Sequence, residues 1–593
     1  MSLFRKQIEA AHPTAQDIAH RRWIYVPYDR LNDQVGPLAE QPASDTGIVF
    51  VESSAKALRR PYHKKKLVVL ISNMRHFALE QQARGVAILY RFSTFSHGQA
   101  LLDIQKEYRL PVLTCTVPAE RELRLDLHHA QANGLNLVIV DDPAWASTTS
   151  DFIELYGSYK AGKSYVMDRF YRRMRQKTGI LMEGSKPLGG RFTYDDENRK
   201  PFRNQVPVPE LPSFPPDPIT EEVIALVERT YPHHFGTIHP FNLPCTKAAC
   251  ETFWQFFLDH LLPHFGPFED AMRDDQQQLF HSKASVLLNL GRLLPLDLVR
   301  DVAERAVAGR APIASCEGFI RQVLGWREFM RHIHDQTDGY RLLKDHVAQE
   351  PEPRSQEKSP NQTATPADSA FTPDDPYAGA RPSALHATLS LPAVYWGAKS
   401  GLHCIDTVVA QVIEEGWSHH ITRLMILSNL ATLCGFSPRE LTDWFWFAYV
   451  DAYDWVVEPN VLGMATYADG GLTATKPYVS GAAYIHRMSN FCGNCELDPK
   501  KSVGPGSCPF TALYWTFLER NEQTLAGNFR LQMPYQSLRK KKPQELVQLR
   551  ARADEAIAHL RGLSRPVYEG GRSPATTSVE TVPASPVETV AAR

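Results

Sequence analysis

The sequence predicts an α/β amino-terminal domain built on a parallel sheet, followed by a large all-α domain. Short apolar runs alternate with helical stretches over residues 1–150, a rhythm typical of strands joined by crossover helices. From residue 219 onward the apolar spacing becomes almost wholly helical. Between these parts, Pro207–Pro218 holds six prolines in twelve residues, which predicts a stiff, extended linker.

The first domain is predicted to contain a Rossmann-like sheet of six buried strands. They are expected at Trp23–Val26, Ile48–Val51, Leu67–Ser72, Val86–Tyr90, Pro111–Cys115 and Leu135–Val140. Helices are expected between them at Phe77–Arg84 and Ser96–Glu107. The domain has no G-x-G-x-x-G loop, so a standard dinucleotide site is not predicted.

Residues 151–218 are predicted to connect the two domains, through an amphipathic basic helix at Tyr165–Lys177, a polar loop at Glu183–Lys200 and the linker. The helical domain is expected to span 219–563, with helices at Ala248–His264, Gln276–Leu294, Leu296–Val307, Ile320–His334, Asp406–Glu415, Ile421–Leu433, Arg439–Val450 and Gln544–Leu563. Two stretches rich in proline and small polar residues, 350–383 and 564–593, are predicted to be a disordered insertion and a disordered tail.

The charge balance limits the classes of partner. The 593 residues carry 65 basic and 66 acidic side chains, a net charge of −1, which excludes a bulk-cationic DNA binder and leaves only local basic patches. Candidate patches are Arg169–Lys177, Lys186–Arg191, Lys500–Lys501 and Arg539–Lys542. The chain shows neither a signal-peptide pattern nor an apolar run of the ~20 residues that span a bilayer. We therefore expect a cytoplasmic protein without membrane contact.

Four of the nine cysteines stand out by their spacing. Cys492 and Cys495 form a C-x-x-C pair, Cys508 precedes a proline, and Cys404 lies far upstream. Two cysteines three apart can bind one metal centre, and a Cys-Pro step ends many iron–sulfur ligand runs. Structural zinc is the rival, although its sites usually pair two such knuckles. The isolated Cys115, Cys245, Cys250, Cys316 and Cys434 are expected to be reduced core residues.

Four further constellations have both a structural and a functional interpretation. His281–Ser285 begins a helix and is either a simple helix cap or a phosphate-binding site. Gln322 and Arg327 lie among Trp326 and Phe329, either in a core helix with one ion pair or in a site. His419 and His420 precede Arg423 at a helix start, where they would be solvated or would transfer protons. The aromatic run 443–449, with Tyr453 and Trp455 beyond it, is core or carries single electrons.

Together, these residues and several longer motifs resemble one family, the iron–sulfur bacterial cryptochromes and photolyases, or photolyase-related proteins, which include prokaryotic (6-4) photolyases. The resemblance runs from Trp23 to Leu563. Its landmarks, in order, are His63–Lys66, Met74–Phe77, Met174–Arg175, Thr178–Met182, Gly189–Phe192, Glu197–Lys200, Gly266–Met272, Gly325–Phe329 and Tyr514–Trp515.

The resemblance implies a cryptochrome/photolyase fold in which the helical domain binds FAD and a [4Fe–4S] cluster. The cluster ligands would be Cys404, Cys492, Cys495 and Cys508. The FAD site would include His281, Ser282, Lys283, Ala284, Ser285, Arg327, Arg423 and Asp451. The electron route would use Trp396, Trp444 and Tyr453, and the lesion pocket Gln322, Tyr478 and Met464. The first domain would hold an antenna, in this family usually 6,7-dimethyl-8-ribityllumazine.

The implied function is light-driven repair of (6-4) photoproducts in UV-damaged DNA by a monomeric lyase, with His420, beside His419, as the proton donor. The alternative is a cryptochrome-type blue-light photoreceptor that signals through a protein partner, and cyclobutane-dimer repair is a third possibility. Two departures from the family pattern concern cofactors. Either Tyr28–Leu31 or Leu31–Gln34 replaces the usual G-D-Q-L turn under the antenna, where Glu52 could also face the chromophore. Val457 replaces a glutamate expected near the flavin.

Overall fold

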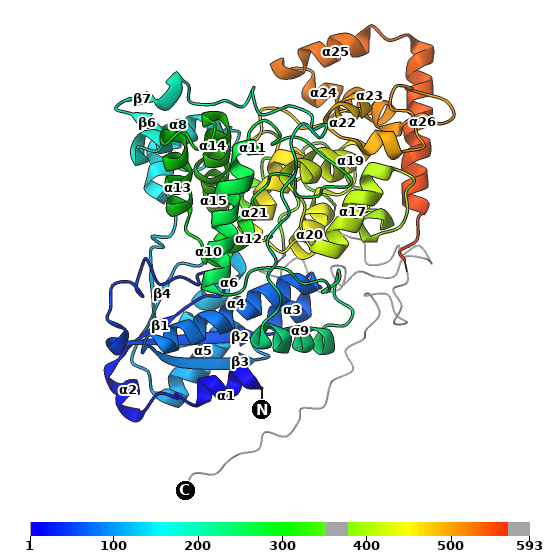
Figure 1. The fold of residues 1–593 in the computed structure, drawn as a ribbon. Helices are drawn as coiled ribbons and strands as arrows, with labels where there is room; N and C mark the ends of the chain where they lie inside the picture. Colours follow the sequence, from blue (N-terminus) through cyan, green and yellow to red (C-terminus); the bar gives the residue numbers. More distant parts are fainter. Residues whose placement is uncertain (1, 352–377, 567–593) are drawn as a thin grey trace.

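The computed structural model describes residues 2–351 and 378–566 (Figure 1). Its first domain contains a five-stranded parallel sheet in the order β3-β2-β1-β4-β5. The strands are β1 (Arg22–Tyr25), β2 (Thr46–Ser53), β3 (Ala87–Ser93), β4 (Leu113–Thr116) and β5 (Leu137–Val140). Ile24 pairs with Ile48 on one side and with Thr114 on the other. The strand order therefore reverses between β1 and β4, and open α/β sheets bind ligands beyond the carboxyl ends of their strands at such a point.

The prediction of a strand at Leu67–Ser72 is wrong, because this run lies within the 20-residue helix α4 (Lys64–Ala83). Leu67, Val68 and Val69 pack into the core of the helical part, whereas Met74 and Phe77 pack under the sheet. The helix is buried on several sides, so its apolar residues form a continuous run. Periodicity alone cannot distinguish such a run from a buried strand.

The remaining helices of the first part cover the sheet or follow its strands. They are α1 (Leu3–Glu9), α2 (Ala15–His20), α3 (Ala55–Arg59), α5 (His97–Tyr108), α6 (Arg121–Ala132) and α7 (Thr149–Tyr156). The α5 helix begins where the Ser96 hydroxyl accepts a hydrogen bond from the Gln99 amide, as an N-cap does.

The second part is helical, as predicted, and lies against the α/β part in Figure 1. Its helices are α8 (Met167–Thr178), α9 (Pro218–Thr230), α10 (Lys247–Phe256), α11 (Leu262–Phe265), α12 (Ser285–Leu290), α13 (Pro295–Val307), α14 (Ile313–Ile320), α15 (Glu328–Gln336), α17 (His403–Glu415), α18 (His420–Thr422), α19 (Asn429–Cys434), α20 (Pro438–Ala448), α21 (Asp454–Glu458), α22 (Ala482–Met488), α23 (Pro509–Arg520), α24 (Glu522–Leu525), α25 (Gln532–Arg539) and α26 (Pro543–Gly562). A small hairpin, β6 (Met182–Glu183) and β7 (Lys186–Pro187), follows α8.

Several predicted boundaries change in the structure. The helix expected at Gln276–Leu294 is only α12, because residues 276–284 form turns and Lys283 takes a left-handed conformation with φ of 51°. Residues 207–217 are neither helix nor strand, which fits the expected extended linker. Side chains of α7 and α8 pack in the core of the helical part, so residues 151–178 are more than a connector.

The ends of the predicted insertion 350–383 are ordered, contrary to expectation. Glu350 is buried, and its carboxylate accepts hydrogen bonds from the Ser437 hydroxyl at 2.5 Å and the Arg439 amide at 2.8 Å. Ser383 is buried as well, and Gln349 bridges to Pro382. The rest of the insertion, 352–377, and the tail from 567 lie outside the described residues.

Four π-helical turns interrupt the helices of the described chain, and three of them contain predicted site residues. Gln322 lies in the turn Arg321–Arg327, Arg423 opens the turn Arg423–Ser428, and Met464 lies in the turn Pro459–Ala465. Such turns are rare and frequently occur at functional sites, because the extra residue reorients a side chain. They position side chains in a way that an ideal 3.6-residue spacing does not.

Candidate functional site

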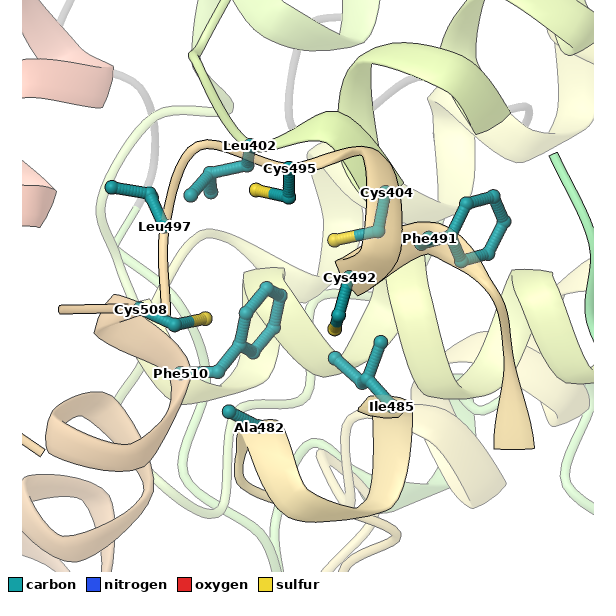
Figure 2. Close-up of a pocket in the computed structure, with 10 residues that line it drawn as sticks. All are labelled: Leu402, Cys404, Ala482, Ile485, Phe491, Cys492, Cys495, Leu497, Cys508 and Phe510. Atoms are coloured by element: carbon teal, nitrogen blue, oxygen red, sulfur yellow. The ribbon is translucent and has the colours of Figure 1, made fainter. Parts of the chain in front are cut away.

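The four predicted ligand cysteines come together from three segments far apart in sequence. Cys404 lies in the first turn of α17, Cys492 and Cys495 lie on a tight turn, and Cys508 caps the start of α23. Figure 2 shows the sulfurs directed into one hollow. The rest of its lining is apolar: Leu402, Ala482, Ile485, Phe491, Leu497 and Phe510. A dry pocket with four thiols suits a metal centre better than it suits polar substrate.

Asp274 fixes this arrangement, and the sequence analysis did not single it out. Its carboxylate accepts a hydrogen bond from the Asn494 side chain at 2.6 Å and lies 3.1 Å from the His403 ring nitrogen. It also contacts the Asn490 amide group. The carboxylate thus joins the cysteine turn to the start of α17, next to Cys404.

The thiols of the hollow disfavour one another's ionisation. Burial, together with the neighbouring Cys508 and Cys495, raises the pKa of Cys492 to about 12. Burial and the other three cysteines raise the pKa of Cys404 in the same way. Four thiolates would therefore need a strongly positive group at their centre, which a metal site supplies. All nine cysteines are free, and the five isolated ones are buried, as expected of core residues.

A second site gathers around Asp451. The Arg423 guanidinium donates two hydrogen bonds of 3.0 Å to the Asp451 carboxylate, and the Ser285 hydroxyl donates a third at 2.6 Å. Arg423 also donates to the Ser418 carbonyl and lies over the Tyr449 ring. The structure therefore joins the predicted helix-start segment 281–285 to the predicted ion pair, although 166 residues separate Ser285 from Asp451.

Three histidines form one wall of this site. The His281 and His419 rings are stacked 4.5 Å apart at 10°, and His420 meets His281 edge to face at 5.5 Å. Burial holds the pKa of both His281 and His419 well below the usual range, and the neighbouring histidines add to this effect at His281. His420 differs, because its side chain is 40% exposed and its Nε2 lies 3.7 Å from the Asp270 carboxylate. Only His420 therefore presents its ring to an outside molecule.

The predicted pocket residues lie on elements around these histidines. Gln322 donates a 2.6 Å hydrogen bond to Glu269, next to the Asp270 that His420 approaches. Tyr478 is partly buried. Its burial and, to a smaller extent, the nearby negative charge of Asp195 raise its pKa. Met464 is partly buried and packs against the core of the helical part.

Arg327 has its main contacts elsewhere. It lies over the Trp145 ring at 4.2 Å and the Trp455 ring at 5.2 Å, and it pairs with Glu328. Burial lowers its pKa to about 10. Its one contact toward the predicted flavin segment is a long 3.5 Å hydrogen bond to the Leu288 carbonyl in α12.

A chain of aromatic rings connects the partly exposed Trp396 region to the ion pair. Tyr395, adjacent to Trp396, meets Trp444 at 5.2 Å, and Trp444 meets Tyr449 at 5.8 Å. Tyr449 then lies under Arg423 at 4.2 Å. The sequence analysis selected Trp396 and Trp444 and included Tyr449 in the aromatic run 443–449, but it did not single out Tyr395. Tyr453 packs instead in the core of the first domain, with Lys66 over its ring.

Comparison with known proteins places the chain in a family. It is 38% identical over 515 residues to a protein named (6-4) photolyase from Agrobacterium fabrum, an alignment that covers 86% of this chain and 93% of that relative. The chain belongs to the photolyase family. Residues 24–243 also match the family model described as deoxyribodipyrimidine photo-lyase-related protein.

Solved structures support the photolyase fold of the chain. A bacterial class III photolyase from Agrobacterium tumefaciens superposes with a TM-score of 0.50 at 12% identity, covering 91% of this chain and 97% of that one. Membership of the photolyase family implies a flavin-binding helical domain. No described helix has the length and hydropathy needed to cross a membrane.

The position expected to approach the photolyase flavin departs from the family pattern, and the structure shows that its neighbour does not compensate. Val457 is 5% exposed and packs in the helical core. Glu458 is bound to Arg439 at 2.9 Å and His334 at 3.0 Å. Although burial raises the pKa of Glu458, the His334 hydrogen bond and the nearby arginines hold it at about 2.

An unusual buried carboxylate lies in the loop that follows β1, at the point where the strand order of the sheet reverses. Asp29 is 1% exposed, and its two oxygens accept no hydrogen bond from the described residues, although the Arg30 guanidinium lies 3.5 Å away. Burial raises its pKa to about 6. Glu52, by contrast, already accepts hydrogen bonds from Arg75 and Tyr90.

The basic stretches of this photolyase are largely neutralised locally. Arg172, Lys177 and Arg191 pair with nearby carboxylates. Arg539 pairs with Glu522, and Lys541 pairs with Glu545. Arg175 is fully buried and donates to backbone carbonyls, so its predicted place in a DNA-binding patch is wrong. Arg175 lies on the buried face of α8 beside Tyr171 and Met174, and the carbonyls of Ile180, Leu181 and Phe192 accept its hydrogen bonds.

Proposed function

We propose that this protein repairs (6-4) photoproducts in UV-damaged DNA with light. The observation that carries the proposal is the histidine wall, in which a single partly exposed imidazole, His420, faces outward beside the Arg423–Asp451 pair. A damaged dinucleotide has lost stacking and flips into a pocket at low cost. The 38% identical relative named (6-4) photolyase supports this choice among the photolyase activities.

The residues around Asp451 fit an FAD. His281 Nε2 and His419 Nδ1 are buried and have no hydrogen-bond partner among the described residues, which is the pattern left by an absent polar partner. Ser282 and Ser285 provide hydroxyls, and Arg423 provides a cation beside an anionic isoalloxazine ring. When bound in its reduced form, FAD supplies the light-driven electron.

The chain's own residues contribute geometry and a proton. His420 donates the proton that allows the hydroxyl of the (6-4) adduct to return to its original base, since imidazole exchanges protons near neutral pH. His419, stacked on His281, holds the backbone and ring position of its neighbour. Gln322 and Tyr478 orient the flipped bases, and Asp270 orients the His420 ring.

The cysteine hollow fits a [4Fe–4S] cluster better than one zinc ion. Tetrahedral zinc with bonds of about 2.3 Å requires sulfurs about 3.8 Å apart. Among the described residues, one group of three potential metal ligands has all its atoms within 4.8 Å of one another, and it consists of His281, His419 and His420. No three of the four cysteine sulfurs are therefore that close to one another. A larger iron–sulfur unit suits the wider arrangement.

The unpartnered Asp29 carboxylate after β1 fits an antenna site, for which we propose 6,7-dimethyl-8-ribityllumazine. The unpartnered oxygens of Asp29 can accept hydrogen bonds from a ring N–H or from ribityl hydroxyls. Relatives present a different turn here, so the identity of the chromophore is best established by releasing it with heat and recording its spectrum.

Asp29→Asn is expected to stabilise the antenna-free protein while it weakens antenna binding. The folded-state pKa of about 6 lies above the ordinary 3.8. The ionised carboxylate therefore lowers the free energy of unfolding by about 3 kcal/mol near pH 7, and this penalty fades as the pH falls from about 6 to about 4. Thermal melts of both proteins from pH 4 to pH 8 measure the difference. A stability gain that stays constant with pH contradicts this role of Asp29.

Trp444→Phe is expected to remove most of the flavin photoreduction while flavin content stays normal. Trp444 links Tyr395 to Tyr449, and phenylalanine fills much of its volume but is far harder to oxidise. Photoreduction is followed by the loss of oxidised-flavin absorbance under blue light with an external reductant. Tyr453→Phe is the matched comparison, because Tyr453 packs in the other domain's core. A large loss in Tyr453→Phe and none in Trp444→Phe would replace this route with another.

The decisive test of function is incubation of purified, reduced protein with DNA that contains one (6-4) lesion, under blue light. Restored thymines, measured by chromatography, support the proposal. A dark sample and DNA with a cyclobutane dimer are the controls. Selective repair of the dimer assigns cyclobutane-dimer activity instead, and equal binding of damaged and intact DNA without repair favours the photoreceptor.

A further inference from the structure

The most exposed aromatic side chain of the described residues is Phe529, at 69%. It begins the short turn Phe529–Leu531 that leads into α25, and Met533, 72% exposed, follows one helical turn later. An isolated exposed leucine or valine needs no explanation, but a phenylalanine and a methionine projecting together form an apolar point on the surface.

The turn that bears Phe529 is held firmly. The Asn528 side chain accepts a hydrogen bond from the Arg530 amide at 3.0 Å and donates one to the Thr475 carbonyl at 2.8 Å. Leu531, on the other side, is buried in the helical core. The Phe529 ring is therefore presented on a fixed support, and the Asn528–Thr475 bond places it next to the segment that leads to Tyr478.

Basic side chains surround this support. Arg530 lies against the Phe529 ring, with its guanidinium 5.4 Å from the ring centre. Burial lowers the pKa of Lys476, and Arg530 and Arg199 lower it as well, since like charges oppose its protonation. Arg199 itself pairs with Asp195. Arg530 and Arg199 also act on Tyr478 of the proposed lesion pocket. Figure 1 shows α24 and α25 at the same end of the molecule as the β6–β7 hairpin.

We propose that Phe529 is a wedge that enters the DNA duplex at the lesion and fills the gap left by the flipped bases. The proposal rests on the proposed repair function. Proteins that open a duplex commonly insert an apolar side chain between bases while neighbouring cations hold the phosphates. Phe529 provides that side chain, Met533 extends its apolar surface, and Lys476 and Arg530 provide the cations.

A wedge acts only where stacked bases must be separated, so the test compares duplex DNA with single-stranded DNA. We compare binding and light-driven repair of one (6-4) lesion in duplex DNA and in the same strand without its complement. Phe529→Ala is expected to weaken binding to the damaged duplex about 10- to 100-fold, the range for loss of one aromatic–base stack. Its affinity for the damaged single strand should stay near that of the wild type, and Phe529→Trp should restore duplex binding.

Phe95→Ala is the matched control, because Phe95 is a 62% exposed phenylalanine on the other domain. It should match the wild type on both substrates. If Phe529→Ala binds the duplex as well as the wild type does, or loses the single strand equally, the wedge is disproved while repair by the wild type still stands. If the wild type repairs neither substrate, the proposed function itself fails. A change of oligomeric state in Phe529→Ala would instead assign the apolar point to contact between copies.

Discussion

His420→Asn is expected to retain fold, cluster, flavin and photoreduction but to lose nearly all (6-4) repair. Asparagine keeps polarity and comparable size, but it cannot deliver a proton. General acid catalysis contributes about 10²- to 10⁴-fold, so the loss should be evident in single-turnover repair of a defined oligonucleotide. The His420 side chain is 40% exposed, whereas the neighbouring His281 and His419 are buried. Replacing His420 should therefore leave the fold intact.

The control for this variant is His128→Asn, an exposed histidine on α6 in the other domain. It should repair at the wild-type rate. If His420→Asn also repairs at that rate, the proton comes from His419 or from water. His419→Asn alone is a weaker test, because His419 is 3% exposed and stacked on His281. Its loss would disturb the packing of the three histidines in addition to any proton transfer.

Cys495→Ala is expected to yield little soluble, flavin-containing protein. The cluster would bind thiolates from α17, from the turn 491–495 and from the start of α23. Removing one ligand therefore removes an anchor for elements distant in sequence, and metal-binding free energy is folding free energy in such sites. Iron and sulfide analysis of anaerobically purified protein gives the measurement.

Cys434→Ala is the matched control, because Cys434 is a buried thiol in α19 that lies outside the hollow. It should retain full iron content and lose only the small packing contribution of one sulfur atom. Zinc without iron in the wild type contradicts the cluster. A soluble Cys495→Ala protein with normal flavin content contradicts its structural role.

Part of the fold could be read from local pattern. The strands near Trp23, Ile48 and Ile88 were predictable because each is a short apolar run bounded by turn residues. The Leu67–Ser72 error has the opposite cause. Helix α4 is buried by both domains, so it lost the polar face that distinguishes a helix in sequence. Arg175 was misplaced for a similar reason, since a charge run does not show which member is drawn inward.

The sequence by itself determined the family, and it singled out the candidate ligand cysteines and the histidine pair, because chemistry of this kind depends on residue type and near-neighbour spacing. Only the tertiary structure decided which of these groups meet. Ser285 bonds Asp451 across 166 residues, Tyr395 and Tyr449 enter the aromatic chain, and Tyr453 leaves it. The same holds for Asp274 at the cysteine hollow and for the exposed Phe529, which we propose as the wedge. Their roles arise from long-range packing and from the way burial leaves some charged groups without a partner. Neighbouring residues in the sequence reveal neither effect.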